Sequence, residues 1–120
     1  VYKRQIEVNI RDAEARNLSE GALVRVFNDR GSCLAVMKIS KDIMQGVVNI
    51  PTGAWLDPSK SDSLSCVHGN PNVLTVDAGT SKLAQGPSSH TCLVEIEQFK
   101  EEPPKIKAFN PPRIIKSIRN

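Results

Sequence analysis

The sequence predicts a mainly β fold, a small β-barrel with irregular crossovers and one or two short helices. With 120 residues, the chain has the size of one domain built on a single apolar core. Aromatic residues make up only 4% of it, so the core has to consist of Val, Ile and Leu, and β-branched residues favour strands. Short apolar runs alternate with turn residues and no repeated βαβ unit is present, which favours a barrel over a doubly wound sheet.

A short helix is expected near the amino terminus. Asn9 is a typical N-cap residue, and Asp12 would place a carboxylate in the first turn. Ala13, Ala15 and the mixed charges around them suit a short exposed helix that ends near Asn17.

Four later segments are predicted to be strands. Residues 22–28 and 32–40 are apolar, β-branched runs, and the Asp-Arg-Gly turn between them indicates an antiparallel hairpin. A third run covers residues 47–51, and Pro51 should end it because proline cannot donate to a ladder. Residues 92–99 alternate glutamate with Val and Ile, as a half-buried strand does.

Residues 52–90 differ from the rest of the chain in being rich in Gly, Ser, Asn, Pro and Asp. A stretch this long without a regular pattern inside a compact domain is usually functional or disordered. Scattered apolar side chains favour an ordered, ligand-facing loop region, because they can anchor it: Trp55, Leu64, Val67, Leu74 and Leu83.

We expect one domain over residues 1–99 and an extended Pro/Lys-rich tail over residues 100–120. Four prolines lie within residues 101–113, and the tail carries six basic and two acidic residues. Residues 1–99 carry ten basic and eleven acidic residues, so they lack the clustered basic face that a nucleic-acid partner requires. With no apolar run of roughly 18 residues and no charged-then-apolar leader, this piece is expected neither to span a membrane nor to carry an export signal.

The reactive residues form no known catalytic or metal-binding motif. Cys33, Cys66 and Cys92 are far apart and include no C-x-x-C pair, so a zinc or redox-disulfide site is not expected. Cys33 and Cys92 lie in apolar runs and should behave as small buried hydrophobes. The G-x-S-x-G elbow, the P-loop and the G-x-G-x-x-G fingerprint are all missing. No residue is therefore assigned to catalysis or to a metal.

Three segments of the polar region carry a resemblance to a known family: GAWLDP at 53–58, CVHGNPNVLT at 66–75 and GTSKLAQGP at 79–87. Together with LVRVFNDRG at 23–31, they are similar to the C-terminal molybdopterin-dinucleotide-binding domain of the dimethyl sulfoxide, trimethylamine N-oxide and biotin sulfoxide reductase family. The resemblance covers about residues 6–99. Any single segment is a weak signal, whereas the combination in this order is specific.

The resemblance implies a double-psi β-barrel that closes over one side of a bis(molybdopterin guanine dinucleotide) cofactor. In the full-length parent, a periplasmic or cytoplasmic oxidoreductase of a prokaryote, that cofactor would hold molybdenum or tungsten and reduce S-oxides or N-oxides. The metal's protein ligand, commonly a serine, comes from an upstream domain, so the implied partners are upstream domains of the same chain. The isolated chain is expected neither to be catalytic nor to carry the cofactor.

Carried over segment by segment, the resemblance implies cofactor contacts from the glycine-rich loops. Asn70, Asn72 and Gln85 are the expected side-chain contacts, since an amide donates and accepts at once, as the edge of a pterin or guanine requires. Glycine lets the backbone approach a ligand closely. The other residues expected near the cofactor are His68, Gly69, Thr80, Ser81 and Gly86, with Asp57 as a weaker candidate.

Each of these residues also has a structural interpretation. Asn70 and Asn72 flank a proline and can be turn formers that cap loop backbone. His68, without a second ligand at metal spacing, can be a structural hydrogen-bonding residue. Gln85 can close a helix end, and Trp55 can pack on the barrel. For the whole domain the alternative is a non-catalytic double-psi-barrel adaptor module, which would not need the clustered HGNPN and LAQGP segments.

Overall fold

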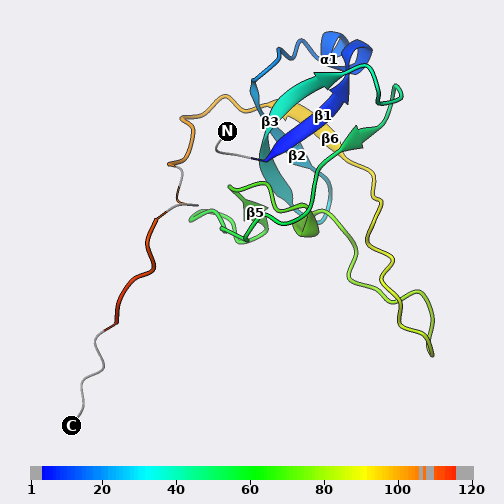
Figure 1. Cartoon of the computed structure of the whole chain (residues 1–120), viewed down its shortest axis with the longest axis vertical. Helices are drawn as coiled ribbons and strands as arrows, with labels where there is room; N and C mark the ends of the chain where they lie inside the picture. Colours follow the sequence, from blue (N-terminus) through cyan, green and yellow to red (C-terminus); the bar gives the residue numbers. More distant parts are fainter. Residues whose placement is uncertain (1–3, 106, 108–109, 116–120) are drawn as a thin grey trace.

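The computed structural model describes residues 4–105, 107 and 110–115 of the chain. Within these residues the structure is mainly β, with six strands, one α-helix and one 3-10 turn (Figure 1). In chain order the elements are β1 (Gln5–Asn9), α1 (Ile10–Ala15), β2 (Leu23–Phe27), β3 (Ser32–Ser40), β4 (Val48–Asn49), β5 (Ser65–Cys66), the 3-10 turn η1 (Pro71–Val73) and β6 (Glu95–Gln98). The predicted mainly β fold with one or two short helices is confirmed.

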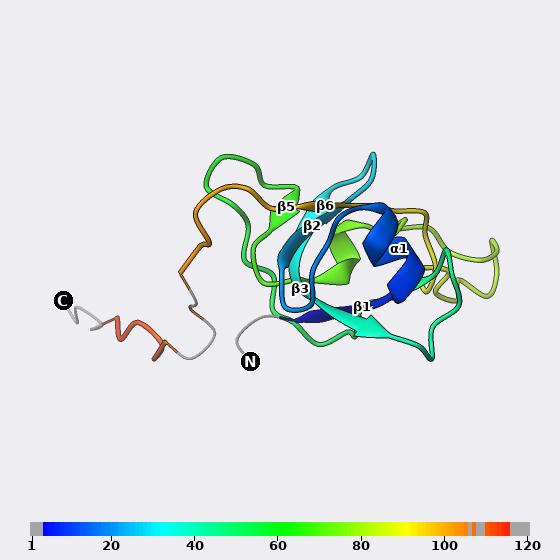
Figure 2. The ribbon, with the colours of Figure 1, turned by 90° about the horizontal axis from the view of Figure 1, so that it is seen from above.

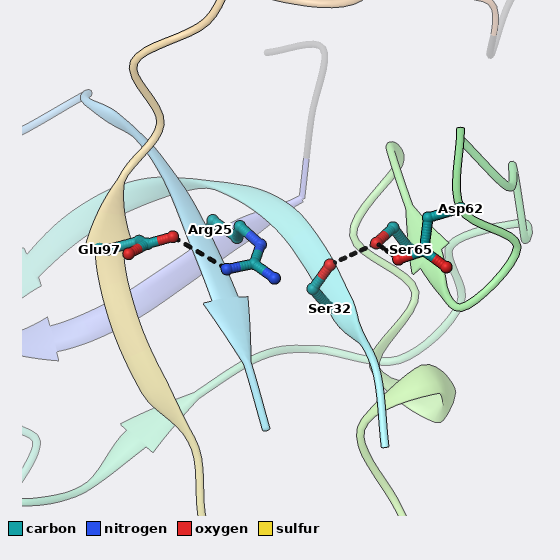
Figure 3. A network of polar contacts seen from close by, with 5 residues as sticks. All are labelled: Arg25, Ser32, Asp62, Ser65 and Glu97. Carbon is teal, nitrogen blue, oxygen red and sulfur yellow. Dashed lines mark hydrogen bonds and ion pairs between the residues drawn. The ribbon is translucent and has the colours of Figure 1, made fainter. Parts of the chain in front are cut away.

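The strands form one sheet that curls into a half-barrel, in the order β4-β1-β3-β2-β6 (Figures 1 and 2). β2 pairs antiparallel with β3 along one edge, and β6 pairs antiparallel with β2. On the other edge of β3, β5 pairs with its first two residues and β1 with its last five, both in parallel. The ion pair between Arg25 and Glu97, at 2.9 Å, links β2 to β6 (Figure 3).

The elements that were predicted from local patterns are present, although several are shorter than expected. The Asn9 side chain accepts a hydrogen bond from Arg11 N at 2.9 Å and so caps α1, which ends at Ala15. β2 and β3 form the predicted hairpin, whose turn is closed by Asn28 Oδ1. β4 keeps only two of the five residues predicted for it, and β6 four of eight.

Two strands were not predicted from the sequence. β1 ends at the helix cap Asn9, and no element was predicted over its first four residues, although Ile6 and Val8 alternate with half-buried residues. β5 is only two residues long and lies within the polar region. Both pair in parallel with β3, so their partner is distant in sequence and no local pattern encodes it.

The core combines the inward-facing strand residues with one residue of α1 and a few loop residues. Its members are Ile6, Val8, Ala13, Leu18, Val24, Val26, Cys33, Ala35, Met37, Cys66, Leu74 and Ile96. Cys33 is buried as expected, and Cys92 is partly buried against the cluster. Burial, reinforced by the neighbouring thiols of Cys66 and Cys92, raises the pKa of the Cys33 thiol to about 12. Cys33 is therefore a protonated, structural thiol.

The anchors of the long loop region are only partly those that the sequence predicted. Leu74 is buried and Val67 is half-buried, as expected. The prediction is wrong for Trp55, Leu64 and Leu83, which are 88%, 60% and 98% exposed. The pairing of β5 with β3 turns Cys66 into the core. The buried side chains of Cys66 and Leu74 therefore anchor the loop region, instead of Trp55, Leu64 and Leu83.

Beyond β6, residues 99–105, 107 and 110–115 lie in no helix or strand (Figure 1). The division into a domain over 1–99 and a tail over 100–120 stays a prediction, and residues 106, 108–109 and 116–120 of that tail lie outside the described residues. Among the described residues, the one α-helix, α1, has six residues, too few to span a bilayer.

The two methionines provide a matched test of the core. Met37 lies on β3 and is almost fully buried, whereas Met44 is 73% exposed. We expect Met37→Ala to lower the free energy of unfolding by about 2–5 kcal/mol, because it removes buried apolar atoms and leaves a cavity. Met44→Ala should change it by less than about 0.5 kcal/mol. Urea unfolding followed by far-UV circular dichroism measures both, and equal losses would contradict this placement of the core.

Candidate functional site

The eight predicted cofactor residues lie in two loops. Residues 66–75 run from β5 through η1 and lie against the sheet, whereas residues 79–87 belong to a loop that projects from it (Figures 1 and 2). In both views the projecting loop, drawn in yellow-green, extends on the side opposite the C-terminal tail. The structure therefore gathers the predicted residues into two groups of four and does not bring them into one compact cluster.

A short chain of hydroxyl groups fixes β5 to β3. Ser65 Oγ lies 2.7 Å from Ser32 Oγ, and it donates a hydrogen bond to Asp62 Oδ2 at 2.7 Å (Figure 3). The Ser65 hydroxyl, followed by the backbone N–H of Leu64, holds the pKa of Asp62 below its usual value. Because Ser32 is buried, this arrangement satisfies a polar side chain at the edge of the core.

A segment that precedes β5 folds back along it. Three contacts join the two: Ser59 N to Ser65 O at 2.7 Å, Val67 N to Asp57 O at 2.9 Å, and an isolated antiparallel bridge between Pro58 and Cys66. Cys66 Sγ also accepts a hydrogen bond from Asp57 N at 3.4 Å. The pairing brings the GAWLDP and CVHGNPNVLT segments side by side.

His68 faces Asp57 as a result of this pairing. His68 Nε2 lies 3.3 Å from Asp57 Oδ2, and the two side chains are 14% and 22% exposed. Lys107 Nζ lies 3.7 Å from the same carboxylate oxygen. The separation of the imidazole and carboxylate is within ion-pair range, but the two atoms are not aligned for a hydrogen bond. Both are buried, and each lacks a hydrogen-bond partner among the described residues.

Gly69 and Asn70 shape the entry to η1. Gly69 has a φ of +77°, and a Cβ at this position would lie 2.8 Å from the carbonyl oxygen of Leu34. Asn70 caps η1, because its Oδ1 accepts a hydrogen bond from Asn72 N at 2.9 Å. The structural interpretation therefore accounts for the Asn70 oxygen. Within the described part of the chain, the side-chain nitrogen of Asn70 makes no hydrogen bond. The exposed side-chain amide of Asn72 makes none either.

The projecting loop is closed by its own contacts. Thr80 N donates to Gly86 O at 3.0 Å, and Ser81 Oγ accepts from Ala84 N at 3.0 Å. Gln85 has a φ of +48°, and its Nε2 donates to the carbonyl of Lys82 at 3.4 Å. Gln85 thus closes a turn and not a helix end. The side chains of Thr80, Ser81 and Gln85 remain exposed, so they are accessible to a ligand.

A cavity of about 360 Å³ lies away from both loops' predicted residues. It is lined largely by apolar residues of the segments 46–50 and 90–96, with Asp12 and Arg16 contributed from the region of α1. None of the eight predicted residues lines it. The cavity separates β4 from β6, the two ends of the sheet, so it is a gap in the wall of the half-barrel.

Two basic residues near the first loop were missed by the sequence reasoning. Lys107 belongs to the predicted tail, and only its contact with Asp57 relates it to the site. Arg4 lies beside two glycines: a Cβ on Gly53 would be 3.0 Å from its Nη2, and a Cβ on Gly69 would be 3.0 Å from its Cβ. Neither residue belongs to a motif, and all three contacts join distant parts of the chain, so the sequence held no signal for them.

A family model and the sequences of known proteins both match this chain, and the two comparisons agree. The model of the family described as Molydopterin dinucleotide binding domain matches residues 1–93. The chain is 48% identical over 112 residues to the trimethylamine-N-oxide reductase of Salmonella typhi, and 42% identical over 111 residues to that of Vibrio cholerae serotype O1. It is 50% identical over 99 residues to trimethylamine-N-oxide reductase 1 of Escherichia coli K12.

These alignments cover 92%, 92% and 81% of this chain, in the same order. They cover only 13%, 14% and 12% of the three relatives. The chain therefore spans about an eighth of the length of the curated relatives that it matches.

Gly69 and Gly21 allow a test of the close packing at the first loop. Both have a positive φ, +77° and +76°, but a Cβ on Gly21 would meet no atom of the described residues within 4 Å. Gly21→Ala should cost about 1–2 kcal/mol of stability, the strain of a left-handed residue. Gly69→Ala should cost clearly more, because its methyl group would also overlap the Leu34 carbonyl. Urea unfolding compares the two variants, and equal losses would show that the loop yields without strain.

Proposed function

The chain belongs to the molybdopterin dinucleotide-binding domain family, and we propose that its two loops form one side of the cofactor site of an S-oxide or N-oxide reductase. The observation that carries the proposal is the extent of the family match, which includes both residues 66–75 and residues 79–87. The cofactor is bis(molybdopterin guanine dinucleotide) with molybdenum. Upstream domains of the same, longer chain are the proposed partners that complete the site.

The side chains of the first loop fit a ligand with donors and acceptors on one edge. The side-chain amide of Asn72 is exposed and has no hydrogen bond within the described residues. The side-chain nitrogen of Asn70 likewise makes no hydrogen bond within them. A pterin ring and a guanine ring both present such mixed edges, which an amide can match with two hydrogen bonds. These two residues are therefore proposed as direct contacts.

The second loop fits the same role through Gln85. Among the residues that the structure describes, its one side-chain hydrogen bond, to Lys82 O, is long at 3.4 Å, so little is lost when a ligand replaces it. Thr80 and Ser81 present exposed hydroxyl groups beside it. Because the loop projects from the half-barrel, it can reach a large ligand that also contacts the first loop (Figure 2).

The charges near the first loop suit the anionic part of a dinucleotide. The guanidinium of Arg4 lies beside Gly53, and its Cβ lies beside Gly69. Lys107 Nζ and His68 Nε2 both lie near the carboxylate of Asp57. A pyrophosphate is commonly bound by backbone N–H groups of glycine-rich turns together with basic side chains. When bound, the cofactor supplies oxygen-atom transfer at its metal, whereas this domain supplies binding and orientation. No residue of this chain is proposed as a metal ligand.

The proposed substrate class follows from the relatives, which are named trimethylamine-N-oxide reductases. We place trimethylamine N-oxide first, with dimethyl sulfoxide and biotin sulfoxide as the related oxides. Substrate choice would lie in other domains of the longer protein. The adaptor alternative is not favoured, because the family match includes both polar loops that an adaptor would not need.

Alanine substitutions in the full-length protein test the proposed contacts. Asn72→Ala and Gln85→Ala should each lower molybdopterin retention, because a lost amide leaves a ligand group unpaired at about 1–3 kcal/mol. Asn49→Ala is the matched control: this exposed amide lies on β4, where it donates to Glu7 Oε2 at 3.2 Å. The measurement is molybdenum and oxidised pterin per mole of purified protein. If both loop variants fold normally and keep the same molybdenum and pterin content, these residues only support the loop structure and do not contact the cofactor.

The proposed substrate class has its own assay. We expect the intact, cofactor-loaded protein to oxidise a reduced viologen dye with trimethylamine N-oxide, dimethyl sulfoxide or biotin sulfoxide as acceptor. Protein freed of cofactor should be inactive and serves as the control. Turnover with nitrate or formate, and none with any of the three oxides, would contradict the assignment while leaving the family membership intact.

A further inference from the structure

We propose that Asp57 is a positioning residue for His68, holding the Nε2 side of the imidazole so that Nδ1 is the atom presented to the cofactor. The inference rests on the proposed function, because it takes His68 to be a cofactor contact. Asp57 itself is assigned no contact with the cofactor, since its Oδ2 atom is buried against His68 and Lys107.

The position of Asp57 is set by the backbone and not by a ligand. Its N–H is bonded to Cys66 Sγ and its carbonyl to Val67 N. Cys66 is buried and belongs to β5, which pairs with β3. The backbone of Asp57 is therefore tied to β5, and through β5 to β3 in the sheet. His68 follows directly after the residue that bonds to Asp57 O, so the same pairing fixes both side chains.

The two facing atoms are the unusual feature of this pair. Asp57 Oδ2 and His68 Nε2 are the buried side-chain polar atoms that lack a hydrogen bond among the described residues. They lie only 3.3 Å apart, so a modest rotation of the imidazole ring would align Nε2–H with the carboxylate. Leaving buried polar atoms without a hydrogen bond is unfavourable, so the aligned orientation of the ring is favoured.

The chemistry of the pair then determines what His68 presents. A carboxylate only accepts hydrogen bonds, so the imidazole nitrogen that faces it has to carry a proton. In the neutral imidazole, Nδ1 is then an acceptor. An acceptor at this position complements the N–H and NH2 groups on the edge of a pterin or guanine, whereas the opposite tautomer would present a donor. Lys107 Nζ, 3.7 Å from the same oxygen, places a positive charge beside the buried carboxylate.

A double-mutant cycle in the full-length protein tests whether Asp57 acts through His68. The four proteins are the unmodified one, Asp57→Ala, His68→Ala and the double variant, and the readout is the rate at which pterin is lost on dialysis. We expect each single variant to lose cofactor about tenfold faster, equivalent to ~1.4 kcal/mol. The double variant should be no faster than His68→Ala, because residues acting as one unit are not additive.

Two further variants separate positioning from loop stability. Asp57→Asn keeps an oxygen that accepts from Nε2–H, so cofactor loss should return to within about twofold of the unmodified rate. Asp62→Ala removes a different carboxylate of the same region, one bonded to Ser65 and Leu64 and not to His68. It should lower the stability of the domain but leave the rate of cofactor loss unchanged.

The outcomes distinguish this inference from the proposed function. If the effects of Asp57→Ala and His68→Ala add fully in the double variant, Asp57 acts independently and the inference is overturned, while the proposed function stands. If His68→Ala retains cofactor normally, the inference is overturned because His68 then makes no contact, while the proposed function is still tested by Asn72→Ala and Gln85→Ala. Where Asp57→Ala prevents folding, Asp57→Leu replaces it in the cycle, because leucine keeps the volume and cannot accept a hydrogen bond.

Discussion

The pairing of β3 with three other strands is the constraint around which the domain is arranged. β2 occupies one edge of β3, and β5 and β1 divide the other edge between them. Because β1 and β5 run parallel to β3, hairpins cannot connect them, and the chain has to leave the sheet and return. The connection from β5 to β6 then passes from one side of β3 to the strand beyond β2. Both predicted cofactor loops lie in that connection, so the sheet topology creates the site's framework.

What could be predicted about the fold depended on how far apart the partners are in sequence. The β2–β3 hairpin and the Asn9 cap of α1 involve neighbouring residues, and their patterns are local. β1 and β5 were missed because Gln5 pairs with Val36 and Cys66 with Cys33, across some thirty residues. The error over Trp55 and Leu83 has another cause: an apolar loop residue shows no periodicity, so the sequence cannot tell which way it points.

The candidate site also has features that could be predicted from the sequence and one that could not. The resemblance supplied the residues of both loops, and the structure adds local reasons for two of them, the positive φ of Gly69 and the cap made by Asn70. The contact between Asp57 and His68 was not predictable, because it depends on a segment folding back onto β5. Two motifs that were recognised separately thus prove to be halves of one structural unit.

In the part of the chain that the structure describes, the sheet does not close into a full barrel, and its two unpaired edges affect whether the free chain associates with other copies in solution. β4 and β6 are the ends of the sheet, and an outer edge offers backbone N–H and C=O groups to any passing strand. β4 limits this by being two residues long, and β6 by carrying the charged, exposed side chains of Glu95 and Glu97, which form ion pairs with Arg16 and Arg25. Leu93, just before β6, is exposed and has no such protection. A lysine in place of Leu93 would add a charge beside this outer edge, the means by which natural edge strands avoid pairing with other chains.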